Sequence, residues 1–284
     1  MTASWSKRLL PTLLALVAGC ASQAPKPPVM VAPVAAAAPA AAPVVAAPVY
    51  FLPGQINSTA LIEPPPVSGS EADRADLRLV LEAQRTAHAV GTTARAVADT
   101  VIDCQRVADV LVPANPAAGV AKNSAPLASG DGAAAVAFAT RAAKQVSGAT
   151  GAPKRLWARP RPYVVSADVE RLGDVAPDSP LAVNGGYERD HTSYPSGHTA
   201  FGTACAIVLA QMVPEQSAAL FARGRLYGES RLIVGAHFPT DLDAGRRIGT
   251  AASAAMLQNA QFQADLRAAR TQLRGALRLA QIAP

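Results

Sequence analysis

Four basic side chains that could bind a phosphate group lie within one stretch of eight residues, although the chain as a whole has few charged residues. They are Lys154, Arg155, Arg159 and Arg161, in a sequence in which 16% of the residues are charged. A guanidinium offers a planar fork to phosphate oxygens and an ammonium offers a point charge, so the stretch could bind a phosphate or a nucleic acid. Taken alone, it is better explained as a solvated basic loop.

A second candidate site is the tetrapeptide Pro-Ser-Gly-His at 195–198, which directly precedes an apolar run with helical spacing. Ser196 and Gly197 would place free backbone N–H groups at a helix N-terminus, where unsatisfied donors and the positive end of the helix dipole attract anions. Gly197 has no Cβ to keep an anion away from the backbone. His198 would then lie beside the anion as a proton donor. An ordinary helix cap explains the tetrapeptide about equally well.

A third candidate site pairs an imidazole with a carboxylate. Arg231 is followed after five residues by His237, and Asp241 comes one helical turn later. A carboxylate in this position can accept a hydrogen bond from Nδ1 of the imidazole, which leaves Nε2 free as a base or nucleophile. Ser230 is expected to support this stretch. The alternative is a His–Asp pair that only caps a helix.

Together, the order and spacing of the three stretches resemble the type-2 phosphatidic-acid phosphatase superfamily, which includes the vanadium-dependent haloperoxidases. The motifs are Lys-x6-Arg-Pro at 154–162, Pro-Ser-Gly-His at 195–198 and Ser-Arg-x5-His-x3-Asp at 230–241. Within the superfamily the chain is most similar to bacterial class A non-specific acid phosphatases. Residues 192–199 differ only at the first position from their hallmark Gly-Ser-Tyr-Pro-Ser-Gly-His-Thr. The resemblance spans residues 61–282.

The resemblance implies a phosphate-binding site that consists of the chain's own residues and needs no metal and no cofactor. Three cations, a serine hydroxyl and a backbone N–H would hold the phosphate oxygens: Lys154, Arg161, Arg231, Ser196 and Gly197. Their positive charges would neutralise the charge on the equatorial oxygens in the transition state. The sequence offers no Asp/Glu cluster to hold a metal. Arg155 and Arg159 are expected to be secondary residues that line the entrance.

The same resemblance implies roles for three catalytic residues in the hydrolysis of phosphomonoesters by an acid phosphatase. His237 would attack phosphorus in line and form a phosphohistidine, and Asp241 would orient His237. His198 would protonate the leaving alkoxide and then activate water. Thr192 in place of a glycine, and His191 where a small residue is expected, leave the substrate profile open.

Other functions compete with this one. A lipid or pyrophosphate phosphatase acting at a membrane surface is the first alternative, although such relatives are normally multi-pass membrane proteins. A vanadate-dependent haloperoxidase and a non-catalytic envelope lipoprotein are less well supported. The net charge of +6 suits acidic small molecules, nucleic acid and anionic lipid equally well. The expected partners are small phosphorylated substrates, and no nucleic acid is expected to bind except nucleotides as substrates. A second copy of the chain is also an expected partner, because dimers are common among relatives.

The first twenty residues are expected to be a secretory signal peptide that ends in a lipobox. Lys7 and Arg8 form its basic end, an apolar stretch follows, and residues 17–20 read Val-Ala-Gly-Cys, which would make Cys20 the lipid-modified N-terminus. Ordinary signal cleavage after Ala24 is the alternative. The protein is therefore expected in the periplasm, with its only membrane contact through a lipid anchor in the outer membrane.

Residues 21–66 are expected to form an extended tether, because they hold eleven of the 24 prolines. Part of this stretch is uncharged, but its prolines argue against a transmembrane helix, since each removes a helical hydrogen bond. The catalytic domain is then expected at 67–284.

The domain at 67–284 is expected to be an all-α bundle of the superfamily's kind, because alanine is abundant and no alternating run of β-branched residues is present. Cys104 and Cys205 fall on apolar stripes, where two buried thiols are favoured over a disulfide. The first helix should begin at a capping box at 68–71, and the second should carry an apolar stripe at 97–111. Further helices should cover 131–147, 201–212, 215–234, 240–258 and 260–280.

Overall fold

The computed structural model describes residues 47–114, 127–177 and 190–282. The expected signal peptide, Cys20 and most of the expected tether lie outside the described residues. Within the described ranges the chain forms helices and loops with no strand, which confirms the prediction of an all-α fold. None of these helices combines the length and the apolar character that a membrane span requires. The α-helices are α1 (Glu71–Ala89), α2 (Thr93–Ala98), α3 (Gln105–Ala108), α4 (Gly130–Ser147), α5 (Gly151–Trp157), α6 (Pro162–Val165), α8 (Gly197–Met212), α9 (Ser217–Ile233), α10 (Pro239–Met256) and α11 (Ala260–Ala276).

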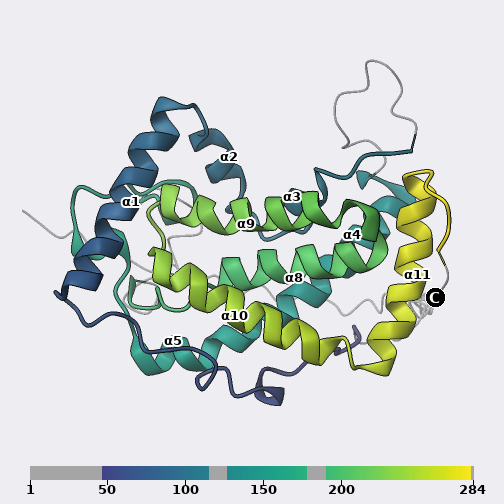
Figure 1. The fold of residues 1–284 in the computed structure, drawn as a ribbon, viewed down its shortest axis with the longest axis horizontal. Coiled ribbons are helices and arrows are strands. Elements are labelled where there is room, and N and C mark those ends of the chain that lie inside the picture. Colours follow the sequence, from purple (N-terminus) through teal and green to yellow (C-terminus); the bar gives the residue numbers. More distant parts are fainter. Residues whose placement is uncertain (1–46, 115–126, 178–189, 283–284) are drawn as a thin grey trace, which may run out of the picture. The chain divides into compact units, whose positions relative to one another are not determined.

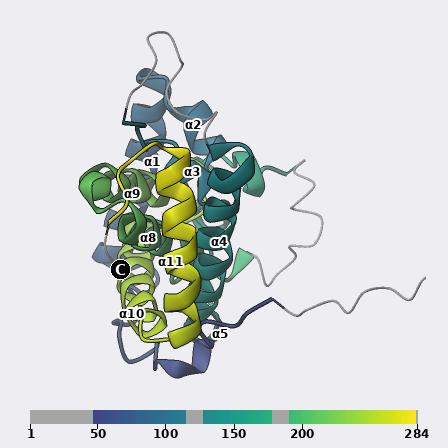
Figure 2. The same cartoon turned by 90° about the vertical axis from the view of Figure 1, so that its right-hand side faces the viewer.

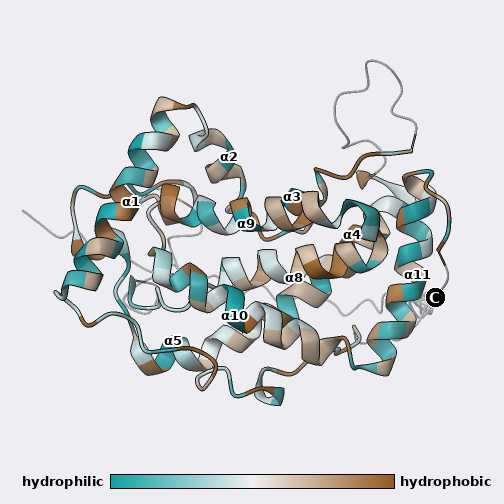
Figure 3. Ribbon diagram, in the orientation of Figure 1, coloured by the Kyte–Doolittle hydropathy of each residue, from teal (hydrophilic) through white to brown (hydrophobic). Residues whose placement is uncertain are grey.

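Helix α8 is the central helix, and α4, α9, α10 and α11 pack around it (Figures 1 and 2). Most of its side chains are buried, as expected for a helix whose residues are apolar on nearly all sides. In contrast, α1 and α11 carry hydrophilic and hydrophobic residues on the same helix (Figure 3). These outer helices bury one face and expose the other.

Glycines let α8 approach its neighbours closely. A Cβ on Gly202 of α8 would lie 2.7 Å from the ring of Tyr227, and a Cβ on Gly249 of α10 would lie 2.8 Å from the carbonyl oxygen of Ala200. Both separations are shorter than real Cβ contacts, so larger residues would force the helices apart. The close packing places the N-terminus of α8 beside the C-terminal part of α9 and the first turns of α10.

The beginning of α1 differs from the sequence prediction. Ser70, and not Ser68, is the N-cap, and its side chain accepts a hydrogen bond from the backbone N–H of Asp73. The reason lies in Gly69, whose φ of 74° is in the left-handed region, so the helix cannot begin before it.

The apolar stripe at 97–111 is not one helix but two short ones, α2 and α3. Between them the hydroxyl of Thr100 bonds to the carbonyl of Val97, and the carboxylate of Asp103 accepts from the N–H of Gln105. Short polar side chains compete in this way with the helical hydrogen bonds.

Cys104 and Cys205 form a disulfide, so the prediction of two free buried thiols is wrong. The preceding loop brings their Cα atoms to 5.4 Å, within the range that a disulfide requires. Spacing along the sequence cannot give this separation in space.

Residues 47–66, the last part of the expected tether, belong to the described structure and to the same compact unit as the helices. Tyr50 and Phe51 are each 2% exposed, and the Tyr50 ring packs edge-on against Phe138 and Phe262. The backbone N–H of Tyr50 donates to the side chain of Gln145. Aromatic side chains supplied by this segment can bury much more surface than its alanines and prolines.

Candidate active site

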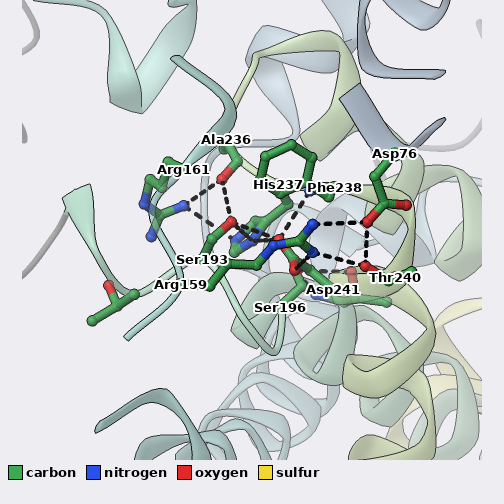
Figure 4. Close-up of polar contacts among 12 residues, drawn as sticks. Asp76, Arg159, Arg161, Ser193, Ser196, Ala236, His237, Phe238, Thr240 and Asp241 are labelled. Carbon is green, nitrogen blue, oxygen red and sulfur yellow. Dashed lines mark hydrogen bonds and ion pairs between the residues drawn. The ribbon is translucent and has the colours of Figure 1, made fainter. Parts of the chain in front are cut away.

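Three helix N-termini bring the sequence motifs together (Figure 4). Arg161 precedes α6, Ser196 precedes α8, and His237 and Asp241 lie at the start of α10. Nη1 of Arg161 lies 3.3 Å from Nε2 of His237. The N–H of Ser196 donates to the carbonyl of Asp241 at 2.9 Å. The motifs therefore meet in space, although up to 80 residues separate them in the sequence.

The imidazole of His237 is held between a carboxylate and a guanidinium. Its Nδ1 lies 3.3 Å from Oδ2 of Asp241, and its Nε2 faces Arg161. An arginine N–H can only donate, so Nε2 is the acceptor and the proton of the neutral ring is on Nδ1. These partners select the tautomer that a nucleophilic Nε2 requires.

The charges around this pair keep the imidazole neutral and the carboxylate ionised. Burial, together with the positive charges of Arg161 and Lys154, holds the pKa of His237 well below its usual value, against the effect of Asp241. Burial alone would raise the pKa of Asp241, but its hydrogen bond with His237 and the charge of Arg159 lower it to about 2. The carboxylate can therefore stabilise positive charge that develops on the ring when Nε2 forms a bond.

Asp241 is fixed by donors on both of its oxygens. Oδ2 also accepts from the hydroxyl of Ser193 at 2.5 Å and from the N–H of Phe238 at 2.9 Å, and Oδ1 accepts from Arg159 at 2.8 Å. Sequence reasoning missed Ser193, although it directly precedes the Tyr-Pro-Ser-Gly-His stretch. A small polar residue next to a motif was the available signal.

Arg159 does not line an entrance, because it is 5% exposed and ion-paired with three carboxylates. Nη1 donates to Asp241 and to the hydroxyl of Thr240, both at 2.8 Å, and Nη2 donates to Asp73 at 2.8 Å and Asp76 at 2.9 Å. The planar fork of an arginine suits such a cluster. Asp73 and Asp76 lie on α1, so this helix is tied to the His237 site. Their spacing of three residues was the only sequence signal.

Two further cations of the motifs, Lys154 and Arg161, donate hydrogen bonds to backbone carbonyls. The ammonium of Lys154 donates to the carbonyl of Thr192, and Arg161 donates to the carbonyl of Ala236 at 2.7 Å. Burial, together with the charges of Arg161 and Arg231, lowers the pKa of Lys154 to about 7. Burial and the charge of Arg231 lower the pKa of Arg161 to about 10. A bound anion would favour the protonated form of both groups.

Arg231 already has a counter-ion, which the sequence motif did not predict. It is 2% exposed, and its two Nη atoms each donate to the carboxylate of Asp174 at 2.9 Å. Its Nε is buried without a hydrogen-bond partner in the described part of the chain. An unsatisfied buried donor is costly, and an anion oxygen would satisfy it.

Ser196 caps α8, and its hydroxyl oxygen accepts from the N–H of Thr199 at 3.2 Å and from the Thr199 hydroxyl at 2.9 Å. The helix cap expected as one interpretation is therefore present. Gly197 is the first residue of α8, and a Cβ there would lie 3.4 Å from the hydroxyl of Thr150 and 3.9 Å from Cε of Lys154. A side chain at Gly197 would occupy space beside the lysine.

His198 has a different partner from His237. Its Nε2 lies 3.1 Å from the carbonyl oxygen of Thr100, and its ring is stacked on that of Tyr227, with 6.0 Å between the ring centroids. Burial, followed by the charge of Arg231, lowers the pKa of His198 to about 3. The ring is thus neutral at weakly acidic pH, whereas the role expected from the sequence requires a proton on it.

Comparison with known proteins confirms the resemblance seen in the sequence. Residues 132–265 match the PAP2 superfamily. A non-specific acid phosphatase of Salmonella typhimurium is 39% identical over 126 residues, which cover 44% of this chain and 46% of the relative. An acid phosphatase of Zymomonas mobilis is 33% identical over 129 residues, 43% of each chain. A non-specific acid phosphatase of Providencia stuartii is 44% identical over 78 residues, 28% of this chain and 32% of the relative.

Each match spans less than half of the relative's length. All three sequence motifs lie within the matched residues 132–265. Several partners of residues in these stretches lie before residue 132: Asp73 and Asp76 contact Arg159, and Thr100 contacts His198. The site is therefore built partly from a region that the family match does not cover.

Proposed function

We propose that this protein is an acid phosphatase that hydrolyses small phosphomonoesters through a phosphohistidine on His237, without a metal. The observation that carries the proposal is the placement of His237, with Nδ1 toward the Asp241 carboxylate and Nε2 beside the Arg161 guanidinium. The acid phosphatase relatives support the reaction class.

In the first step Nε2 of His237 bonds to phosphorus as the ester P–O bond breaks, and the leaving oxygen takes a proton from His198. Lys154, Arg161 and Arg231 stabilise the charge on the equatorial oxygens. Asp241 stabilises the positive charge on the phosphorylated ring. In the second step water attacks phosphorus, a proton passes to His198, and the P–N bond breaks.

The proton on His198 can arrive with the substrate. A phosphomonoester has its second pKa at about 6, so below that pH it binds as a monoanion that carries a proton. The bound phosphate also adds negative charge beside His198, which favours the protonated ring. We therefore expect activity at weakly acidic pH despite the low pKa of His198 in the site without substrate.

Two alanine variants test these roles. His237→Ala should abolish turnover and any phosphoenzyme trapped by an alkaline denaturing quench with radiolabelled substrate. His198→Ala should lose about 10²–10⁴-fold on an alkyl phosphate, the usual contribution of a general acid, and much less on a nitrophenyl ester. Phosphoenzyme in His237→Ala, or equal losses on both esters in His198→Ala, would refute the assignments.

Inhibitors test the transition state and the absence of a metal. Vanadate adopts the trigonal-bipyramidal geometry of the reacting phosphorus and should inhibit strongly, because the cations that stabilise the transition state also bind it. A chelator should leave the activity unchanged. Loss of activity on chelation, restored by a divalent metal, would contradict the proposal.

The proposal includes a location in the periplasm, with Cys20 lipid-modified and the chain anchored to the outer membrane. It rests on the sequence of the first twenty residues, which lie outside the described structure. Cys20→Ala should release the protein from the membrane fraction of expressing cells. An unchanged membrane fraction would refute the anchor. A homodimer, common among relatives, remains part of the proposal.

A further inference from the structure

The loop that contacts His198 is fastened to α9 at its first residue. This loop, residues 99–104 between α2 and α3, is called here the 99–104 segment. Asp99 is 1% exposed, and its carboxylate accepts hydrogen bonds from both Nη atoms of Arg223 and from the hydroxyl of Ser230 at 2.7 Å. A buried carboxylate with three donors is a rigid attachment, because releasing it would leave buried charges unpaired.

Two other contacts fix the rest of the 99–104 segment. The carbonyl of Val101 accepts from the hydroxyl of Tyr227 at 2.9 Å, and Cys104 is bonded to Cys205 of α8. Tyr227 also stacks on the ring of His198. Tyr227 of α9 thus contacts both the segment and the imidazole.

The contact with His198 uses the backbone of the segment, and this determines where the ring carries its proton. The carbonyl oxygen of Thr100 can only accept, so Nε2 of His198 is the donor at 3.1 Å. Nε2 then keeps its hydrogen in the neutral ring, and Nδ1 is the nitrogen that gains and loses a proton.

We propose that Asp99 is a positioning residue for His198. By fixing the 99–104 segment to Arg223 and Ser230, it holds the Thr100 carbonyl against Nε2 and leaves Nδ1 to deliver the proton to the leaving group. The role in turnover rests on the proposed phosphatase function. The tautomer of His198 does not, because it can be measured in the enzyme without substrate.

The first test is a measurement of the tautomer by nitrogen NMR on the ¹⁵N-histidine-labelled protein. Wild type should show a protonated Nε2 and an unprotonated Nδ1 for His198, whose signals are assigned by their loss in His198→Gln. In Asp99→Asn, which removes the charge that holds Arg223, the Nε2–H form should no longer predominate. A wild-type ring protonated on Nδ1, or an unchanged tautomer in Asp99→Asn, would overturn the proposal even if the enzyme proves to have a different activity.

The second test is the dependence of the rate on the leaving group. Asp99→Asn should lose about tenfold more activity on an alkyl phosphate than on a nitrophenyl ester, a part of the ~10²–10⁴-fold that a general acid contributes. The control is Glu229→Gln, which breaks the exposed ion pair of Glu229 with Arg225 on the same helix and should leave the ratio unchanged. Equal losses on the two esters would indicate a merely structural role and overturn the proposal.

Ser230→Ala keeps the proposal testable if Asp99→Asn does not fold. It removes one of the hydrogen bonds to Asp99 and little volume. The shift in tautomer and in the ratio of the two rates should have the same direction and a smaller size. A folded Ser230→Ala protein with the wild-type tautomer and ratio would count against the positioning role.

Discussion

At the scale of single residues, the two histidines of the site differ in the charge of the group that holds them. His237 donates to a carboxylate, whereas His198 donates to the backbone carbonyl of Thr100. A carboxylate stabilises a positive ring, which suits a nucleophile that becomes a charged phosphoimidazole. A neutral carbonyl stabilises a protonated ring much less than a carboxylate does, so a protonated His198 gives up its proton readily. These partners suit the roles proposed for the two residues, a nucleophile for His237 and a proton donor for His198.

Lys154 carries a prediction that follows from its lowered pKa. In the folded protein this pKa is about 7, below the usual 10.5, so the unfolded chain binds more protons between these values. The free energy of unfolding therefore rises with pH across this range. A bound dianion should raise the pKa of Lys154 again, so the protein should take up protons when it binds sulfate at about pH 8. A lysine with its ordinary pKa would already be charged at this pH and would take up almost none.

The measurement is calorimetry of sulfate binding in buffers of different ionisation enthalpy. Lys154→Arg is the matched variant, because arginine stays protonated and should show almost no proton uptake at this pH. Equal uptake in wild type and Lys154→Arg would assign the protons to another group and contradict the prediction.

The sequence predicted the motif residues of the site better than their supporting residues. Lys-x6-Arg-Pro and the two histidine motifs have fixed local spacing, so a pattern can identify them. Arg159 was visible in the basic stretch, but its burial depends on Asp73 and Asp76, more than eighty residues earlier. The Thr100 carbonyl is a backbone atom, so no residue type could reveal its contact with His198. Such contacts follow from packing and not from local sequence.

At the scale of helices, α1 is part of the candidate site although it lies before the matched residues 132–265. Its carboxylates Asp73 and Asp76 share the guanidinium of Arg159 with Asp241. Burial raises the pKa of Asp76 in spite of its hydrogen bonds to Thr240 and Arg159. Without the guanidinium, three carboxylates would lie together with no positive charge among them.

Arg159→Gln should therefore destabilise the whole fold. Removing one partner of a buried ion pair costs about 3–5 kcal/mol, and the loss in unfolding free energy should lie in this range. The matched control is Arg225→Gln, because the pair of Arg225 with Glu229 is exposed and should contribute nothing measurable. Chemical denaturation of the three proteins checks this. A loss for Arg159→Gln no larger than that of the control would show that the cluster does not stabilise the fold.

The long helices were predictable because their apolar residues repeat with the helical period. The predicted helices at 131–147 and 240–258 correspond to α4 and α10 within a few residues. The stripe at 97–111 has the same period but breaks into α2 and α3, because polar side chains bond to the backbone between them. Periodicity alone cannot show such a break.

At the scale of the molecule, segments that precede residue 132 are held to the helices around α8 by a few strong attachments. Tyr50 packs against Phe138 and Phe262, and its hydroxyl donates to Asp265 at 2.7 Å. The proline content of residues 21–66 gave no indication of this contact. Composition describes the average character of a segment, whereas two aromatic residues, Tyr50 and Phe51, determine where this one packs. Another attachment is the disulfide between Cys104 and Cys205.

The disulfide should contribute a large share of the stability of the folded unit. It joins residues 101 apart in the sequence, and both sulfurs are buried. In the chain-entropy account, closing a loop of about 100 residues stabilises a protein by up to about 4.7 kcal/mol, because the crosslink restricts the unfolded chain. Cys104→Ala/Cys205→Ala should lower the unfolding free energy by an amount that approaches this value. Reductant should lower the denaturation midpoint of wild type and leave that of the double variant unchanged. If wild type and double variant unfold at the same denaturant concentration under oxidising conditions, the disulfide does not stabilise the fold.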